Sequence, residues 1–270
     1  MFVFAHVSDL HLGQDRQDGG ARAARRARRV MTYLDELPGS LDAVLVTGDI
    51  ADHGTPEEYR AAAGILGSRH PVLLCPGNHD VRPAYRELLR DRGDTERAAD
   101  PGAPVDRIHR LPWRAAGTAP GRPAAEVTFL MCDSTIPGRH DGFLGDTTLA
   151  WLDRRLAQSP SDAPAFVAFH HPPVDLHTPY VDEIRQHGEE RLAEVLSRHE
   201  QVVAVLCGHA HTGAATTFAG LPLLVAPGVV STVTLPWEGD DPVDYELPPV
   251  IAFHVLHDDL RLTTHFRTVP

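Results

Sequence analysis

The chain has 270 residues, of which 42% are hydrophobic, and this is enough apolar material for one large core or two small ones. Its formal charge of −12 argues against a broad surface for nucleic acid or anionic membranes, because phosphate groups attract net positive charge. All 25 basic residues are arginine, and alanine, glycine and proline are abundant, which indicates GC-rich bacterial coding and says little about function.

Apolar runs typical of strands recur along the chain, and helix-like segments separate the early ones. The predicted strands are Phe2–Val7, Ala43–Thr47, Val72–Cys75, Val127–Cys132, Ala165–Phe169, Val202–Cys207, Ala214–Phe218, Leu223–Ala226, Ile251–Leu256 and Arg261–Phe266. The predicted helices are Gly20–Leu37, Thr55–Leu66, Pro83–Arg90, Asp146–Ala157 and Glu189–His199. The second helix opens with TPEE, a cap followed by proline and two acids.

Strands that alternate with helices predict an α/β fold, with a βαβ sheet built by the early part of the chain. The last quarter changes to strand after strand, so we expect antiparallel strands over residues 214–267. We predict a single domain over residues 1–270 with a motif-bearing core over 3–215. The Pro/Gly-rich stretch Ala98–Pro123 is expected to be a surface excursion.

Three cysteines, Cys75, Cys132 and Cys207, each close an apolar run, and we predict buried thiols in a reducing cytoplasm. No apolar run approaches the ~18 residues of a membrane helix. The N-terminal stretch MFVFAHVSDLHLG lacks the basic region and cleavage site of a signal peptide. We therefore expect a cytoplasmic protein with no membrane partner.

Side chains that can bind metals follow five of the predicted strands. The stretches are SDLHLG, TGDIAD, GNHD, HHPP and GHAH, and they supply Asp9, His11, Asp49, Asn78, His79, Asp80, His170, His171, His209 and His211. The carboxyl ends of strands in α/β sheets gather ligands, so the five loops are expected to converge. Imidazole together with carboxylate suits Zn, Fe or Mn better than Ca. Each motif alone is an ordinary turn or loop, whereas the ordered set of five indicates a metal site.

The stretch GNHD gives each residue a chemical task. Gly77 lets the backbone turn sharply after a buried strand. Asn78 can reach a metal through its amide oxygen, and His79 can face a substrate. Asp80 can either orient His79 or hold the loop.

The complete ordered pattern resembles that of the calcineurin-like metallophosphoesterases: D-x-H, then G-D, then G-N-H-D, then H, then G-H-x-H. Within that family the chain is similar to bacterial class III cyclic nucleotide phosphodiesterases and glycerophosphodiesterases. That similarity rests on GDIADHGTPEEY, CDSTIPGRHDGFLGDTTLAWLDRRL, FHHPPV and LCGHAHTGAATTFAGLPLLVAPGV. The resemblance implies a two-sheet β-sandwich flanked by helices and a metal-dependent phosphodiesterase with a dinuclear site.

The resemblance also implies a ligand set for two divalent or trivalent transition-metal ions, Mn, Fe or Zn. One ion would be held by Asp9, His11, Asp49 and His211, and the other by Asp49, Asn78, His170 and His209. Asp49 would bridge the two ions. The doublet His170–His171 leaves the choice of ligand open from the residues alone, and the family likeness favours His170. His171 then has the opposite strand parity and is a candidate support behind the ligands as well as a candidate substrate contact.

Such a pair of ions, ~3.5–4 Å apart, can clamp a phosphoryl centre and activate a bridging hydroxide for attack on phosphorus. The ions, the carboxylates of Asp9 and Asp49, and the hydroxide leave one formal positive charge, which matches a phosphodiester but also attracts a monoester. We expect His79 to stabilise the equatorial oxygens and to protonate the departing alkoxide. Asp80 is expected to hold His79 in the required tautomer and orientation.

Weaker features complete the set of candidates. His53, His140, His171 and His177 are candidate substrate contacts, and Val174–Ile184 with Tyr180 is either a substrate wall or an ordinary surface loop. The arginines of Arg22–Arg29 spread around a helix, which favours a solvated face over nucleic-acid binding. The acidic stretch Trp237–Pro249 is either a subunit contact or the rim of a site.

The sequence therefore predicts hydrolysis of small phosphodiesters such as cyclic nucleotides or glycerophosphodiesters, without a stable nucleic-acid partner. A phosphomonoesterase or a nuclease of the same superfamily is the alternative. A non-catalytic interaction module is disfavoured because every expected ligand is present. The sequence is compatible with a homo-oligomer.

Overall fold

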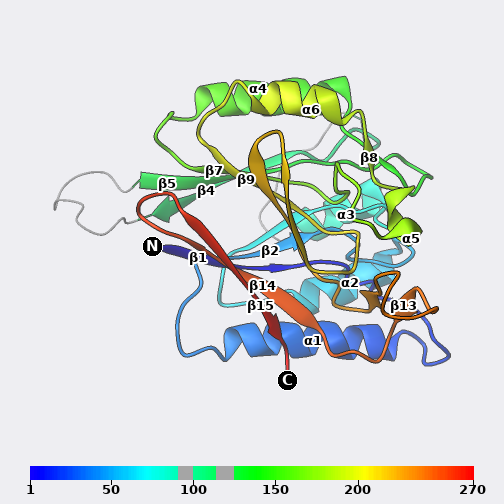
Figure 1. Cartoon of the computed structure of the whole chain (residues 1–270). Coiled ribbons are helices and arrows are strands. Elements are labelled where there is room, and N and C mark those ends of the chain that lie inside the picture. The colour runs from blue at the N-terminus through cyan, green and yellow to red at the C-terminus, as the bar shows by residue number, and fades with distance from the viewer. Residues whose placement is uncertain (91–99, 114–124) are drawn as a thin grey trace.

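A computed structural model describes residues 1–90, 100–113 and 125–270, and these residues fold into two stacked sheets with helices on the outer faces (Figure 1). The first sheet contains β1 (Phe2–Val7), β2 (Ala43–Thr47), β3 (Val72–Cys75), β14 (Val250–Leu256) and β15 (Leu262–Thr268). The second contains β4 (Arg107–Trp113), β5 (Ala125–Met131), β7 (Ala165–Ala168), β9 (Val202–Cys207), β10 (Ala214–Phe218) and β11 (Leu221–Val225). This arrangement confirms the predicted two-sheet sandwich.

The spatial orders of the strands are β15-β14-β1-β2-β3 and β10-β11-β9-β7-β5-β4. Strands β1, β2 and β3 run parallel to one another, and so do β5, β7 and β9. The carboxyl ends of three parallel strands therefore lie together in each sheet, as βαβ connections require. Two small ribbons lie outside the sheets, β6 (Gly142–Phe143) with β8 (Gln186–His187) and β12 (Thr232–Val233) with β13 (Val243–Asp244).

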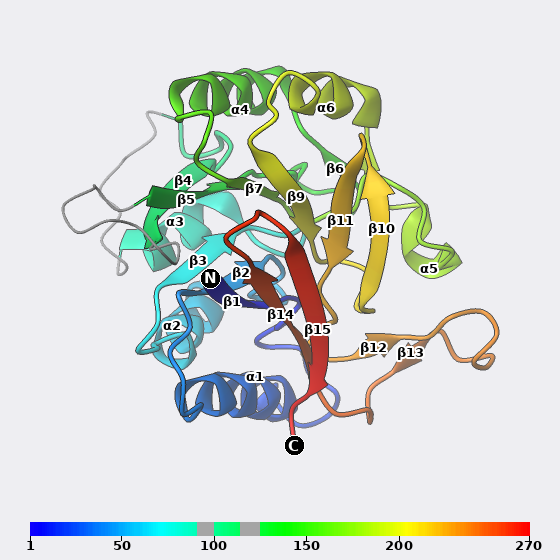
Figure 2. The ribbon, with the colours of Figure 1, turned by 60° about the vertical axis from the view of Figure 1, so that its left-hand side comes forward.

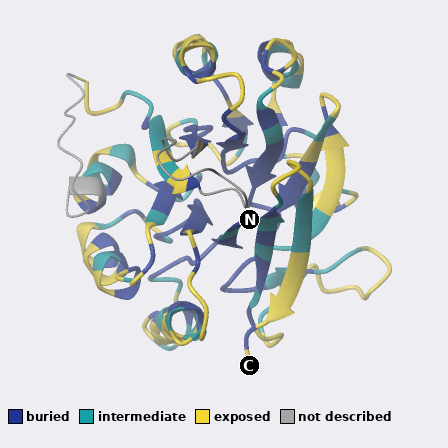
Figure 3. Cartoon of the chain, turned by 90° about the vertical axis from the view of Figure 1, so that its left-hand side faces the viewer, coloured by how far each residue is buried: buried dark blue, intermediate teal, exposed yellow. Residues whose placement is uncertain are grey.

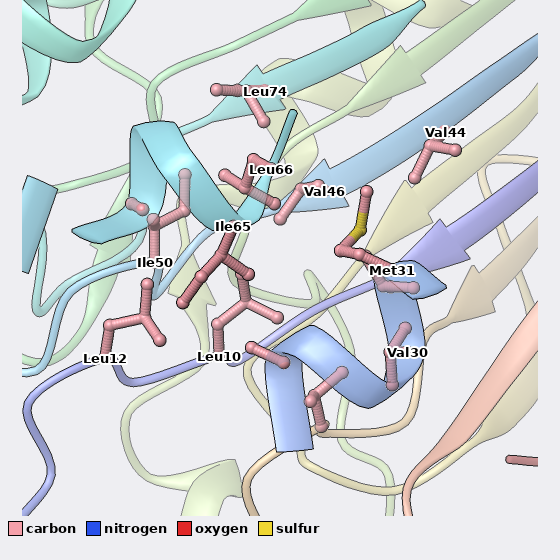
Figure 4. Packing of buried hydrophobic residues seen from close by; sticks show 14 of the residues in the cluster. Leu10, Leu12, Val30, Met31, Val44, Val46, Ile50, Ile65, Leu66 and Leu74 are labelled. Atoms are coloured by element: carbon pink, nitrogen blue, oxygen red, sulfur yellow. The ribbon is translucent and has the colours of Figure 1, made fainter. Parts of the chain in front are cut away.

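The helices are α1 (Ala21–Asp35), α2 (Pro56–Ile65), α3 (Arg82–Arg90), α4 (Asp146–Gln158), α5 (Pro179–Asp182) and α6 (Glu189–Leu196). Helices α1 and α2 pack on the outer face of the first sheet, where Met31 and Ile65 meet Val44, Val46 and neighbouring residues (Figure 4). Helices α4 and α6 cover the second sheet (Figure 2). Each helix buries one face and exposes the other (Figure 3), as the amphipathic sequences require.

A third apolar layer lies between the two sheets. Phe4 packs edge-on against Phe129 and Phe166, with ring centroids 5.1 Å apart in both pairs. The three cysteines are free and buried, as predicted. In the part of the chain that the structure describes, every helix is too short or too polar to span a lipid bilayer.

The start of α2 follows directly from its sequence. The hydroxyl of Thr55 accepts the backbone N–H of Glu58, and the Glu58 carboxylate accepts the N–H of Thr55, so both halves of the predicted capping box are present. Pro56 occupies the first helical turn, where its missing N–H costs nothing.

Two predictions about strands were wrong in part. Residues 107–113, within the expected surface excursion Ala98–Pro123, form the edge strand β4, which pairs with β5. Among the residues of β4 only Trp113 is buried, so its sequence lacks the apolar pattern of an inner strand. Residues 98–99 and 114–123 of that stretch lie outside the described part.

In the last quarter, β10, β14 and β15 pair antiparallel, but β11 runs parallel to β9. The prediction of one domain over residues 1–270 stays a prediction.

Candidate metal centre

The loops after five strands meet at one end of the sandwich. They bring together the seven predicted ligands Asp9, His11, Asp49, Asn78, His170, His209 and His211. Five of these residues are buried, and Asn78 and His211 are half-buried. Loops from both sheets contribute, because β1, β2 and β3 end beside β7 and β9. The convergence expected from the strand ends is therefore present in the fold.

The backbone of this region is unusual. Five of the seven side chains stand on residues with positive φ, namely Asp9 (58°), His11 (44°), Asp49 (48°), His209 (67°) and His211 (51°). A left-handed conformation costs a non-glycine residue of order 1 kcal/mol or more. Such conformations persist where the surrounding structure imposes them, and they cluster at functional sites.

The first group of ligand atoms surrounds Asp49 and His11. The Nε2 atom of His11 lies 3.4 Å from Asp49 Oδ2 and 3.2 Å from His211 Nε2. The Nε2 atom of His211 in turn lies 3.3 Å from Asp9 Oδ1. Two donors each ~2.1 Å from one ion lie roughly 3.0–3.4 Å apart at tetrahedral or octahedral angles. The spacing fits a common ion between these atoms.

The second group shares Asp49 with the first. The Nε2 atom of His170 lies 3.3 Å from Asp49 Oδ2 and 3.2 Å from His209 Nδ1. The buried Oδ1 atom of Asn78 has no hydrogen-bond partner among the described residues, and neither has Asp9 Oδ1. A buried acceptor without a partner is costly, so both oxygens fit an ion as their missing partner.

The outward ring nitrogens of three histidines are held by neighbours. His11 Nδ1 donates to the carboxylate of Asp52 over 2.8 Å, and His170 Nδ1 donates to the carbonyl of Thr47 over 2.6 Å. His211 Nδ1 lies 2.8 Å from the hydroxyl of Ser231. These contacts fix the rings so that the Nε2 lone pairs face the cluster.

Sequence reasoning missed Asp52, Thr47 and Ser231 as supports of the site. Asp52 stands three residues after Asp49 in GDIAD, so a search for a carboxylate beside a histidine ligand would have found it. Thr47 acts through its backbone, and Ser231 follows Asp49 by more than 180 residues, so no local pattern marks either.

The charges of the cluster shift several pKa values. Burial would raise the pKa of Asp49, but the imidazoles of His170 and His11 hold it well below its usual range. Burial would lower the pKa of His170, but the carboxylates of Asp49 and Asp9 raise it to about 9. For His209, burial dominates and holds the pKa well below its usual value. Two buried carboxylates thus face a group of imidazoles, a donor set that suits Zn, Fe or Mn.

The expectation that Asp80 orients the His79 ring was wrong. The His79 Nδ1 atom donates to the backbone carbonyl of Asp52 over 2.7 Å, and 32% of the side chain is exposed. The Asp80 carboxylate instead accepts from the N–H groups of Ile50, Ala51 and Gly77 and from the Tyr59 hydroxyl. Asp80 therefore ties the Asp49 loop to the Asn78 loop, which is the second task that its sequence allowed.

The histidine doublet is divided between two layers. His170 faces Asp49, whereas His171 lies behind His170 and is completely buried. His171 Nε2 donates to the carbonyl of His140 over 3.1 Å, and its Nδ1 lies 2.8 Å from the Ser134 hydroxyl. Because both ring nitrogens are engaged and the ring has no exposed surface, the expected substrate contact by His171 was wrong.

The other candidate contacts differ in position. His140 lines the cavity over the cluster, with its ring 6.0 Å from that of His79. His53 is absent from the lining, and its Nδ1 donates to the Glu58 carboxylate over 2.8 Å. His177 is exposed and also absent from the lining. Of these three histidines His140 alone lines the cavity, and its substrate contact stays a prediction.

The cavity has a volume of about 480 Å³ and a mouth formed by two segments far apart in the sequence. One segment supplies Tyr180, Val181 and Ile184. The other supplies Val243 and Tyr245 from within the stretch Trp237–Pro249, which therefore forms part of the rim. The volume lies within the range of small-molecule sites.

Residues 2–213 match a family model described as calcineurin-like phosphoesterase. A glycerophosphodiester phosphodiesterase from Enterobacter lignolyticus is 31% identical over 255 residues, which cover 93% of this chain and 86% of that protein. A cAMP/cGMP dual-specificity phosphodiesterase from Mycobacterium tuberculosis is 30% identical over 87% of this chain and 69% of its own length.

Solved structures share the fold at low identity. A dimetal phosphatase from Danio rerio superimposes with a TM-score of 0.69 at 17% identity and covers all of this chain and 96% of its own. A purple acid phosphatase from yellow lupin has a TM-score of 0.65 at 12% identity, covering 99% of this chain and 51% of its own.

Proposed function

The chain belongs to the calcineurin-like phosphoesterases, and from that membership and the geometry of the cluster we propose that it is a metal-dependent phosphodiesterase acting on small phosphodiesters. The observation that carries the proposal is the position of Asp49 Oδ2, which lies 3.4 Å from His11 Nε2 and 3.3 Å from His170 Nε2. One carboxylate oxygen between two groups of donors is what a bridging ligand requires.

We assign Asp9, His11, Asp49 and His211 to one ion and Asp49, Asn78, His170 and His209 to the other. The mixed nitrogen and oxygen donors favour Mn, Fe or Zn. When bound, such ions supply Lewis-acid activation of water and of the phosphoryl oxygens. The protein supplies fixed donors, since Asp52 and Thr47 hold the rings of His11 and His170.

His79 is proposed to act on the substrate. Its Nδ1 proton is committed to the Asp52 carbonyl, so Nε2 is the nitrogen available to the cavity that the residue lines. Burial would lower the pKa of His79, but the Asp49 charge and the Asp52 carbonyl outweigh it and raise the pKa. A protonated ring at this position can stabilise phosphoryl oxygens or protonate the leaving alkoxide.

The relatives support diesters as the substrate class, since they are named for glycerophosphodiesters and for cyclic nucleotides. A cavity of about 480 Å³ and a net charge of −12 support a compact substrate over a nucleic-acid polymer. Three buried free thiols support a reducing cytoplasm as the place of action.

The ratio of activities on bis(p-nitrophenyl) phosphate and p-nitrophenyl phosphate tests the substrate class. Both release the same leaving group, so the ratio reports on the second ester group alone. The proposal predicts a higher kcat/KM for the diester. A higher kcat/KM for the monoester, or efficient cleavage of duplex DNA without turnover of any small diester, would contradict it.

A further inference from the structure

The cavity has two chemically different halves. One part of its lining carries the charged and polar side chains of the cluster, and the other part is mostly apolar and aromatic. We call this second part the mouth; it consists of Tyr180, Val181, Ile184, Val233, Val243 and Tyr245. A phosphate at the cluster would leave its ester substituent between these side chains, so the mouth is where substituents are distinguished.

The two walls of the mouth come from different parts of the chain. Helix α5 supplies Tyr180 and Val181, and the ribbon β12–β13 supplies Val233 and Val243, with Tyr245 directly after it. Both views of the ribbon place α5 and β12–β13 at the same end of the molecule (Figures 1 and 2). Each wall therefore contributes one tyrosine.

The Tyr245 wall is held firmly in place. The guanidinium carbon of Arg16 lies 3.6 Å from the centroid of the Tyr245 ring, close enough for a cation–π contact. Arg22 donates to the carbonyl of Val230, and Arg26 donates to the carbonyls of Val229 and Leu247. Arg22 and Arg26 thus join α1 to both flanks of the ribbon, so the predicted solvated face of this helix does not include these two arginines.

A ring held this way is suited to stacking. The guanidinium carbons of Arg16 and Arg22 lie 3.6 Å and 5.6 Å from the Tyr245 ring centroid, so the ring that lines the cavity is already ordered. Tyr180 is 60% exposed in the absence of a ligand, and a flat group beside it would remove aromatic surface from water. A short, flexible polyol offers little surface to either tyrosine.

A further polar group lines the same cavity. The Oε1 atom of Gln14 is buried, has no hydrogen-bond partner among the described residues, and belongs to a cavity-lining side chain. A ligand with an N–H or O–H group at its edge would satisfy this acceptor. The cavity therefore combines aromatic surface with one acceptor for a hydrogen bond.

We infer that Tyr180 and Tyr245 are the specificity-determining residues of this chain, and that they select phosphodiesters whose alcohol carries a flat ring over diesters of short open-chain alcohols. The inference rests on the proposed diesterase function. Arg16 acts through Tyr245 and is a positioning residue.

The test compares kcat and KM for 3′,5′-cyclic AMP, bis(p-nitrophenyl) phosphate and glycerophosphoethanolamine in Tyr180→Ala and Tyr245→Ala. Removal of a stacking ring costs about 5- to 150-fold in binding. We expect a loss of that size in kcat/KM for cyclic AMP, mainly through KM, and less than about threefold for glycerophosphoethanolamine. The aryl diester also carries flat rings, so its kcat/KM should fall as that of cyclic AMP does, and a loss for cyclic AMP alone would contradict selection by a flat ring.

Two controls separate stacking from folding. Tyr180→Phe and Tyr245→Phe keep the ring and should retain the wild-type preference. Trp237 lies in the loop between β12 and β13, is 73% exposed and does not line the cavity. Trp237→Ala should therefore leave kcat/KM unchanged for cyclic AMP and for glycerophosphoethanolamine. Equal losses on ring-bearing and ringless diesters, or no loss on either, would overturn the inference.

Binding of AMP and of glycerol 3-phosphate to the metal-loaded protein, measured by calorimetry, distinguishes this inference from the proposed function. A protein that turns over no diester yet loses AMP affinity in the alanine variants loses the function and keeps only the recognition of a flat ring by the two tyrosines. A protein that turns over diesters while the variants bind AMP as tightly as the wild type retains the function and loses the inference.

Discussion

The Nδ1 atom of His79 lies 2.7 Å from the backbone carbonyl oxygen of Asp52. A carbonyl only accepts hydrogen bonds, so this contact places a proton on Nδ1 and holds the ring through a backbone group. The carboxylate of the same Asp52 accepts from His11 Nδ1. One residue thus supports the substrate-facing histidine through its backbone and a metal-facing histidine through its side chain.

Replacing His79 by alanine should lower kcat by ~10²–10⁴-fold, the usual worth of a general acid. The loss should be smaller for p-nitrophenolate, which needs little protonation, than for alkyl or ribosyl leaving groups. Metal content should stay near that of the wild type. Equal losses for both leaving-group classes would leave His79 as an electrostatic clamp only. Loss of metal would make His79 a ligand, an arrangement that its proximity to His11 and Asp49 allows.

Replacing Asp52 by alanine separates the two tasks of that residue, because the variant keeps the carbonyl that holds His79. The variant should bind the His11-held metal about 10- to 100-fold more weakly, the usual effect of removing a carboxylate behind a histidine ligand. Activity should return at saturating metal. Metal titration monitored by activity and by calorimetry measures both effects, and Asp15→Ala on the loop after His11 is the control. Unchanged affinity would show that Asp52 does not support the ligand.

Replacing Gly77 by alanine should disrupt the site by sterics alone. An added Cβ would lie 2.2 Å from Asp49 Oδ1 and 2.4 Å from the Asp49 backbone nitrogen, so the shared carboxylate would have to move. We expect weaker binding of both metals and a large loss of kcat. Gly64→Ala is the matched control, because nothing lies within 4 Å of its added Cβ and the helix should become more stable. Full metal occupancy in Gly77→Ala would refute this account of the loop.

Stability of the metal-free protein should fall in mild acid, partly because of His254. Burial lowers the pKa of His254 to about 3, and its ring lies 3.2 Å from His6. The unfolded chain, with a pKa near 6.5, then binds the proton first, so stability is lost as the pH falls from about 6.5 towards 3. Between about pH 7.5 and about pH 5.5 this one histidine should remove about 1.4 kcal/mol of the unfolding free energy.

Urea unfolding of His254→Leu at the two pH values measures that contribution. The variant should lose less stability on acidification than the wild type, by about the same 1.4 kcal/mol. His265→Leu, which replaces an exposed histidine on the neighbouring strand, should keep the wild-type pH dependence. Identical pH dependence in His254→Leu and the wild type would remove His254 from the explanation.

The strand ends explain why so much of the site could be predicted from sequence. Asp9, Asp49, Asn78, His170 and His209 each follow an apolar run, and parallel strands bring such ends together. The supports of the site could not be predicted in the same way. Thr47 acts through a carbonyl, the role of Asp52 depends on the turn of its loop, and Ser231 reaches His211 only in the folded chain.

The errors have physical reasons as well. The sequence placed Asp80 beside His79 because they are neighbours in the chain, but a tight turn directs the carboxylate inward to three N–H groups. Strand β4 was missed because this edge strand mixes charged, polar and apolar residues and buries only Trp113. The mouth of the cavity was only partly foreseen, since Tyr180 and Tyr245 meet through tertiary structure.

The central claim is a site for two ions that share Asp49, and its most direct test is activity on bis(p-nitrophenyl) phosphate as metal is added back to metal-free protein. The account predicts that activity reaches its plateau at two equivalents of Mn, Fe or Zn per chain, that a chelator abolishes it, and that Asp49→Ala binds both ions poorly. Full activity at one equivalent or fewer, or activity that survives excess chelator, would contradict it.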